Sequence, residues 1–102
     1  MIRRETVERH DQLIRDLNEE RAAALRRISG RLEILIGQLR EARGRIAGLD
    51  GEARAWELAR YGDLRRMAWR YRWYLEVQRE SLGLHDHRYV DESYVIPGPL
   101  ES

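Results

Sequence analysis

Residues 24–49 read ALRRISGRLEILIGQLREARGRIAGL, and their apolar side chains recur at steps of three and four. The same spacing extends back toward the N-terminus. At about 100° per residue, one side of a single helix carries all of these side chains. The members of this stripe are Val7, Ile14, Leu17, Ala24, Leu25, Ile28, Leu32, Leu35, Leu39, Ala42, Ile46 and Leu49, interrupted by His10 and Arg21. A stripe of this length predicts a long helix that packs against another helix.

The residues after the stripe predict a tight turn and a second helix. Gly48-Leu49-Asp50-Gly51 is typical of a reversal, and Asp50 can cap the following helix. Gly83 and Leu84 supply the residues that a Schellman motif needs at the end of that helix. The apolar face expected for the second helix is Trp56, Leu64, Met67, Ala68, Tyr71, Tyr74, Leu75 and Leu82.

We therefore predict an all-α fold. A long antiparallel, coiled-coil-like helical hairpin occupies residues 1–84, with helices at 2–48 and 52–82 and a turn at 49–51. A tail follows at 85–102, first as a short helical turn and then extended, because Pro97 and Pro99 disfavour helix at the residues before them.

The two predicted helices differ in length. Folding at the turn places Leu82 near residue 19, so the apolar residues of segment 1–18 have no neighbour within the hairpin. The tail is apolar enough to cover that segment, through Tyr89, Val90, Tyr94, Val95 and Ile96. A second subunit is the alternative cover, and it would give a helical bundle across a two-fold axis.

Composition excludes several classes of protein. Charged residues make up 36% of the 102 residues, yet the formal net charge is +1, so the chain as a whole does not attract nucleic acid or an acidic membrane. Cysteine is absent, which excludes disulfides and thiolate metal sites. No segment has the ~20 apolar residues of a membrane span, and the N-terminus has no signal-peptide core. We expect a soluble, cytoplasmic protein without a membrane partner.

All 19 basic residues are arginine. A GC-rich bacterial genome favours arginine codons and explains this usage without any function. Selection for bidentate contacts to anions, which arginine makes and lysine does not, is the alternative.

Trp69, Trp73 and Val77 follow one another at four-residue steps, away from the apolar face of the second helix. We call these three residues the Trp ridge. Two exposed tryptophans on a charged helix are unusual, so the tail or a second subunit is expected to cover them. In the other interpretation the ridge binds a partner together with Arg66 and Arg70, because tryptophan and arginine are typical interface anchors.

Arginines surround the ridge at positions 65, 66, 70, 72 and 79. Arginine beside tryptophan resembles the surface of proteins that bind single-stranded nucleic acid. Acidic residues at 57, 63, 76 and 80 dilute this charge, and cation–π packing explains the same spacing without a ligand. Nucleic-acid or polyanion binding is therefore the alternative function.

Motifs for catalysis or metal binding are weak. His85 and His87 are candidate metal ligands, and His10 can join them only if the tail reaches the first helix near its start. The chain has no Gly-rich phosphate loop and no nucleophile elbow. An enzyme or metalloprotein built on His85 and His87 is the third interpretation. We predict a non-enzymatic structural or adaptor protein without a cofactor, which acts through helix–helix association, most readily as a homodimer.

Overall fold

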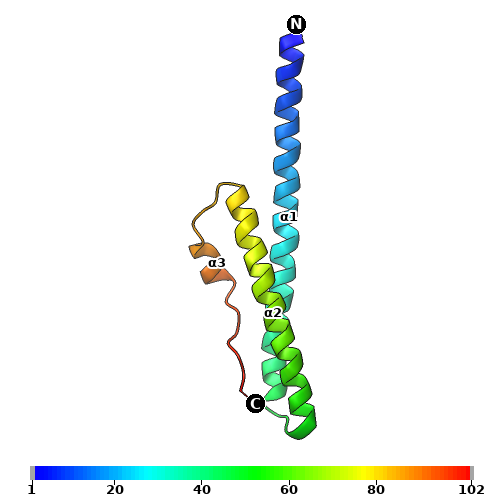
Figure 1. The fold of residues 1–102 in the computed structure, drawn as a ribbon, viewed down its shortest axis with the longest axis vertical. Coiled ribbons are helices and arrows are strands. Elements are labelled where there is room, and N and C mark those ends of the chain that lie inside the picture. The colour runs from blue at the N-terminus through cyan, green and yellow to red at the C-terminus, as the bar shows by residue number, and fades with distance from the viewer. Residues whose placement is uncertain (1, 102) are drawn as a thin grey trace.

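The computed structural model describes residues 2–101, and their side chains from Arg4 onward. Met1 and Ser102, which the predicted hairpin and tail include, lie outside these residues. Helix α1 spans Ile2–Ile46, α2 spans Gly51–Ser81 and the short α3 spans Arg88–Ser93. The two long helices pack against each other as an antiparallel hairpin, so the molecule is elongated, at 76 × 22 × 15 Å (Figure 1). The predicted all-α hairpin is confirmed.

The stripe of α1 forms one wall of the hydrophobic core. Its buried residues contact buried residues of α2 and of the tail in one cluster. The cluster consists of Leu32, Leu35, Ile36, Leu39, Ala42, Ile46, Tyr61, Leu64, Ala68, Leu75, Val90, Tyr94 and Ile96. The core therefore has three layers, which are α1, α2 and the tail, because the tail contributes buried residues that the two helices alone do not supply.

The buried face of α2 differs from the expected one. Trp56 is 79% exposed and Tyr74 is 38% exposed. Tyr61, which the prediction omitted, is buried, with only 2% of its surface exposed. Because the tail packs beside Tyr61, the covered face of α2 lies closer to the tail than the sequence predicted. Trp56 and Tyr74 then lie at the outer margin, and their assignment to the core is wrong.

The turn between α1 and α2 depends on glycine and not on a side-chain cap. Asp50 is the N-cap residue of α2, but its side chain makes no capping hydrogen bond. Its carbonyl instead accepts a hydrogen bond from the backbone N–H of Arg54 at 3.2 Å. Gly51 has φ +58°, a left-handed conformation that side chains disfavour.

The end of α2 is a Schellman motif. The N–H of Leu84 donates to the carbonyl of Arg79, and the N–H of Gly83 donates to the carbonyl of Glu80, both at 2.9 Å. Gly83 has φ +84°. This motif turns the chain away from α1, and α3 then lies beside α2 (Figure 1).

The tail runs back along α2 toward the hairpin turn (Figure 1). Five side chains of α2 donate hydrogen bonds to tail carbonyls, and residues later in the tail are bound by residues earlier in α2. The pairs are Arg79 with Asp86 (3.4 Å), Arg72 with Tyr94 (3.3 Å), Arg65 with Pro97 (2.9 Å), Tyr61 with Gly98 (2.5 Å) and Arg54 with Glu101 (3.1 Å). The expectation that the tail covers the start of α1 is therefore wrong, because the tail leads in the opposite direction.

The Tyr94 phenol, which lies in the tail, is expected to make the stability of the fold depend on pH in the alkaline range. Burial, with the neighbouring Tyr89, raises the pKa of the Tyr94 phenol above its ordinary value of 10.0. In the unfolded chain this phenol loses its proton at lower pH than in the folded chain, so stability falls as pH rises above about 10. We expect Tyr94→Phe to flatten the decline in melting temperature between pH 9 and pH 11. An equal decline in both proteins would contradict this assignment.

Candidate functional site

The start of α1 is one exposed apolar surface. Residues 4–21, which we call the overhang, are all exposed, and α1 there stands clear of α2 (Figure 1). Val7, Leu13, Ile14 and Leu17 are 55%, 56%, 43% and 41% exposed. The apolar stripe thus continues for about five helical turns without cover from this chain.

The Trp ridge is the second exposed apolar surface. Trp69, Trp73 and Val77 are 47%, 59% and 40% exposed. The guanidinium of Arg72 lies 5.0 Å from the ring centre of Trp69, and the Trp73 ring contacts Tyr74 with centroids 5.6 Å apart. The tail leaves the ridge largely open, so the expectation that it covers these tryptophans is wrong. Cover by a second subunit and binding of another partner both stay as interpretations.

Three of the five arginines around the ridge hold the tail. Arg65 and Arg72 donate to tail carbonyls, and Arg72 also pairs with Asp91 of α3. Arg79 donates to the carbonyl of Asp86 at 3.4 Å, and its guanidinium lies 5.1 Å from the ring centre of Tyr89. These three arginines are spaced by seven residues and serve the fold.

Arg66 and Arg70 are the arginines left on the outer surface. Arg66 pairs with Asp63, one turn away, and stays largely exposed. The side chain of Arg70 is exposed and makes no ion pair or hydrogen bond with the described residues 2–101. The basic surface available to a ligand is therefore much smaller than the sequence suggests.

Arg43, Arg54 and Tyr61 make contacts to the tail that the sequence analysis missed. Arg43 of α1 donates to both the hydroxyl of Tyr61 and the carbonyl of Gly98, each at 3.2 Å. Because the contacts to the tail end on backbone carbonyls, the tail sequence carries no sign of them. The seven-residue spacing of Arg65, Arg72 and Arg79 was the one available signal.

The histidines do not converge. His87 Nε2 lies 2.7 Å from Oε1 of Glu80, and His85 is exposed in the loop before α3. His10 lies on the overhang, away from the path of the tail. Among the described residues, no three histidine, cysteine or acidic side chains are grouped so that they could hold a metal ion.

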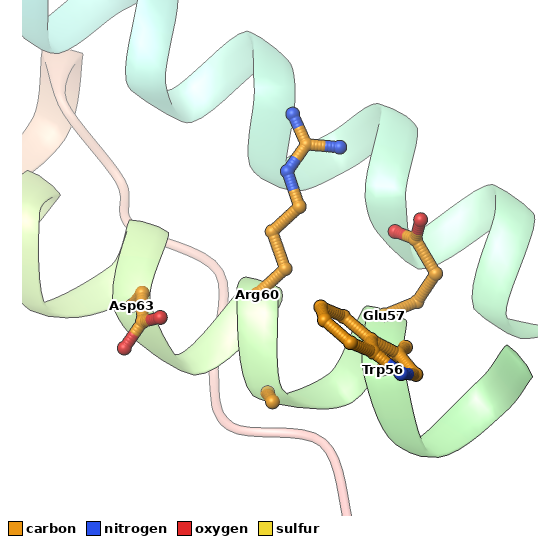
Figure 2. Close-up of a pocket in the computed structure, with 5 residues that line it drawn as sticks. Trp56, Glu57, Arg60 and Asp63 are labelled. Carbon is orange, nitrogen blue, oxygen red and sulfur yellow. The ribbon is translucent and has the colours of Figure 1, made fainter. Parts of the chain in front are cut away.

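A shallow hollow near the hairpin turn surrounds Trp56. Trp56, Glu57, Ala59, Arg60 and Asp63 line about 270 Å³, below the usual range of small-molecule sites. Figure 2 shows Glu57 and Arg60 extending toward α1 while the indole lies across the outer side of α2. Glu57 forms an ion pair with Arg45 of α1 at 3.5 Å, so its carboxylate joins the two helices. The hollow is a surface depression beside an exposed ring.

In the described part of the chain, neither long helix is apolar enough to cross a membrane. Comparisons of the chain with protein families, with curated protein sequences and with solved structures found no significant match.

Proposed function

We propose that this chain is a non-enzymatic structural or adaptor protein that acts through helix–helix association. The observation that carries the proposal is the overhang, a helical segment of about 27 Å that presents an apolar stripe to solvent. Packing within the chain does not require α1 to extend beyond the end of α2. An apolar stripe on an extension of this kind is typical of a surface that receives another helix. A cytoplasmic setting remains a prediction from the sequence.

The first partner we propose is a second copy of the chain. Multi-angle light scattering at tens of micromolar should give a mass near twice the 12.2 kDa of one chain, and it should fall on dilution. Association buries apolar side chains that are otherwise hydrated, which is why it is favourable. A mass of 12.2 kDa that persists on concentration would remove self-association and leave a different helical protein as the partner.

The Trp ridge is the second surface we assign to association. Trp69, Trp73 and Val77 lie on the outer side of α2, with Arg66 and Arg70 beside them. Large aromatic side chains with nearby arginine commonly dominate the free energy of protein–protein binding. Because α1 and the tail pack on faces of α2 other than the ridge, a partner bound at the ridge leaves the hairpin intact.

The alternative function is binding of a polyanion such as single-stranded nucleic acid. It is favoured by the exposed Arg70 beside Trp69 and Trp73. If it holds, fluorescence anisotropy should detect binding of single-stranded DNA at low salt. The affinity should fall steeply as salt rises, because each neutralised phosphate releases counterions.

The variant Arg66→Glu/Arg70→Glu should abolish that binding, since it reverses the two outward charges. Arg9→Glu/Arg15→Glu, on the overhang, is the matched control and should reduce binding only slightly. Absence of binding by the unmodified chain at low salt would remove the polyanion hypothesis, because electrostatic binding is strongest there.

A further inference from the structure

The overhang exposes the same face of α1 that α2 covers closer to the hairpin turn. Val7, Ile14 and Leu17 fall on the same side of the helix as the buried Leu32, Leu35 and Leu39. Beyond Ser81 the chain turns aside into α3, so this face is left open (Figure 1). A helix bound there would lie on the continuation of the line of α2.

The overhang has the spacing of a coiled-coil seam. Val7 and Ile14 occupy equivalent positions one heptad apart, and His10 and Leu17 occupy the other seam position. Arg21 ends the apolar run close to the point where α2 begins to cover α1. The uncovered seam therefore matches the uncovered length of helix.

Antiparallel pairing with a second overhang brings these side chains together. A two-fold axis at the level of residue 12 pairs positions whose numbers sum to 24. Val7 then faces Leu17 of the second copy, and His10 faces Ile14, with each pair occurring twice. Leu13, the overhang's exposed apolar residue outside the seam, lies beside the axis, where it approaches its own counterpart.

The same axis fits the length and direction of the helices. The overhang spans residues 4–21, so its midpoint lies at the axis and the two overhangs overlap almost end to end. The incoming helix runs in the direction of α2, with its N-terminus next to the C-terminal end of α2, an arrangement that helix dipoles favour. A parallel pair would instead drive the second α1 into the space that α2 occupies. The two hairpins of the antiparallel dimer lie at opposite ends.

We propose that two copies of this chain dimerise through antiparallel pairing of residues 4–21 of α1, about a two-fold axis at the level of residue 12. The inference rests on the proposed self-association and identifies the surface and register. The paired length of about 27 Å is short, so the interface is expected to be smaller than the standard 1,600 Å² or so and the dimer to dissociate on dilution. The polar His10 in the seam weakens the dimer further.

Sedimentation velocity on the full chain and three variants tests the surface. Leu17→Glu should raise the dissociation constant by about 100-fold or more, because each dimer contains this position twice. Gln12→Glu adds the same charge on the opposite side of the helix and should leave the dissociation constant within about threefold of that of the unmodified chain. His10→Leu should tighten the dimer by about tenfold or more, since it replaces a polar seam residue with an apolar one. Circular dichroism should show unchanged helix content, because the overhang makes no contact with α2.

Cysteine cross-linking tests the register, because the chain has no cysteine of its own. A mixture of Val7→Cys and Leu17→Cys chains should be joined by a short bismaleimide, whereas neither variant alone should cross-link. Cross-linking of Val7→Cys alone would indicate a parallel pair and overturn the proposal. A dimer that survives Leu17→Glu would also overturn it, while leaving self-association through the Trp ridge in place. A chain that is monomeric at every concentration would overturn both.

Discussion

Removal of the tail is expected to destabilise the hairpin strongly. A chain that ends at Leu84 retains the Schellman motif but loses Val90, Tyr94 and Ile96, which are 0%, 7% and 8% exposed in the core. Burial of each such side chain contributes about 1.5–3 kcal/mol, and release of the tail returns part of this as conformational entropy. We expect a net loss of about 3 kcal/mol, which lowers the melting temperature by more than about 10 °C.

A matched pair of valines keeps this prediction testable if the shortened chain aggregates. Val90→Ala removes two methyl groups from a fully buried position, and Val95→Ala removes the same groups from one that is 55% exposed. The first should cost about 1–2 kcal/mol and the second close to nothing. Equal melting temperatures for the two variants would show that the tail does not dock in the core.

Tryptophan fluorescence provides a second measurement of the effect of removing the tail. Trp69 and Trp73 are already about half exposed with the tail in place, and Trp56 is more exposed still. The emission maximum should therefore shift by only a few nanometres when the tail is removed. A large red shift would mean that the tail reaches the Trp ridge in solution, as the sequence alone suggested.

The helices were predictable because their information is local and periodic. Apolar residues at steps of three and four identify α1, and Gly83 with Leu84 marks the end of α2, since few other residues suit that motif. Trp56 shows the limit of the approach. Its size and hydrophobicity favoured burial. Whether its side of α2 is covered depends on where the tail packs, and the periodicity of the sequence does not encode the path of the tail.

The path of the tail was not predictable for a physical reason. Its docking rests on backbone carbonyls, which every residue has, and on arginines that also suit an anion-binding surface. The sequence therefore indicated the arginines and tryptophans as one candidate site. The structure divides them, because Arg65 and Arg72 face the tail while Trp73 and Arg70 face outward.

Tyr61 is expected to be the most sensitive single position among the residues of α2 that contact the tail. Its ring is 2% exposed, and its hydroxyl donates to the carbonyl of Gly98 at 2.5 Å. Tyr61→Phe retains the ring, and Arg43 still bonds that carbonyl, so the variant should lose only about 1 kcal/mol. Tyr61→Ala also empties the ring's place between α1, α2 and the tail, and should lose about 3–5 kcal/mol.

Urea denaturation at one fixed protein concentration measures these differences, with Tyr74→Phe and Tyr74→Ala as controls on the same helix. Tyr74 is 38% exposed, so Tyr74→Ala should cost well under half as much as Tyr61→Ala. The decisive quantity is the gap between the Phe and Ala variants, because it separates the ring's packing from the hydroxyl's hydrogen bond. If the tail is docked as described, that gap is wide at position 61 and narrow at position 74. Equal gaps at the two positions would mean that Tyr61 is not enclosed by the tail, and the three-layer core would have to be abandoned.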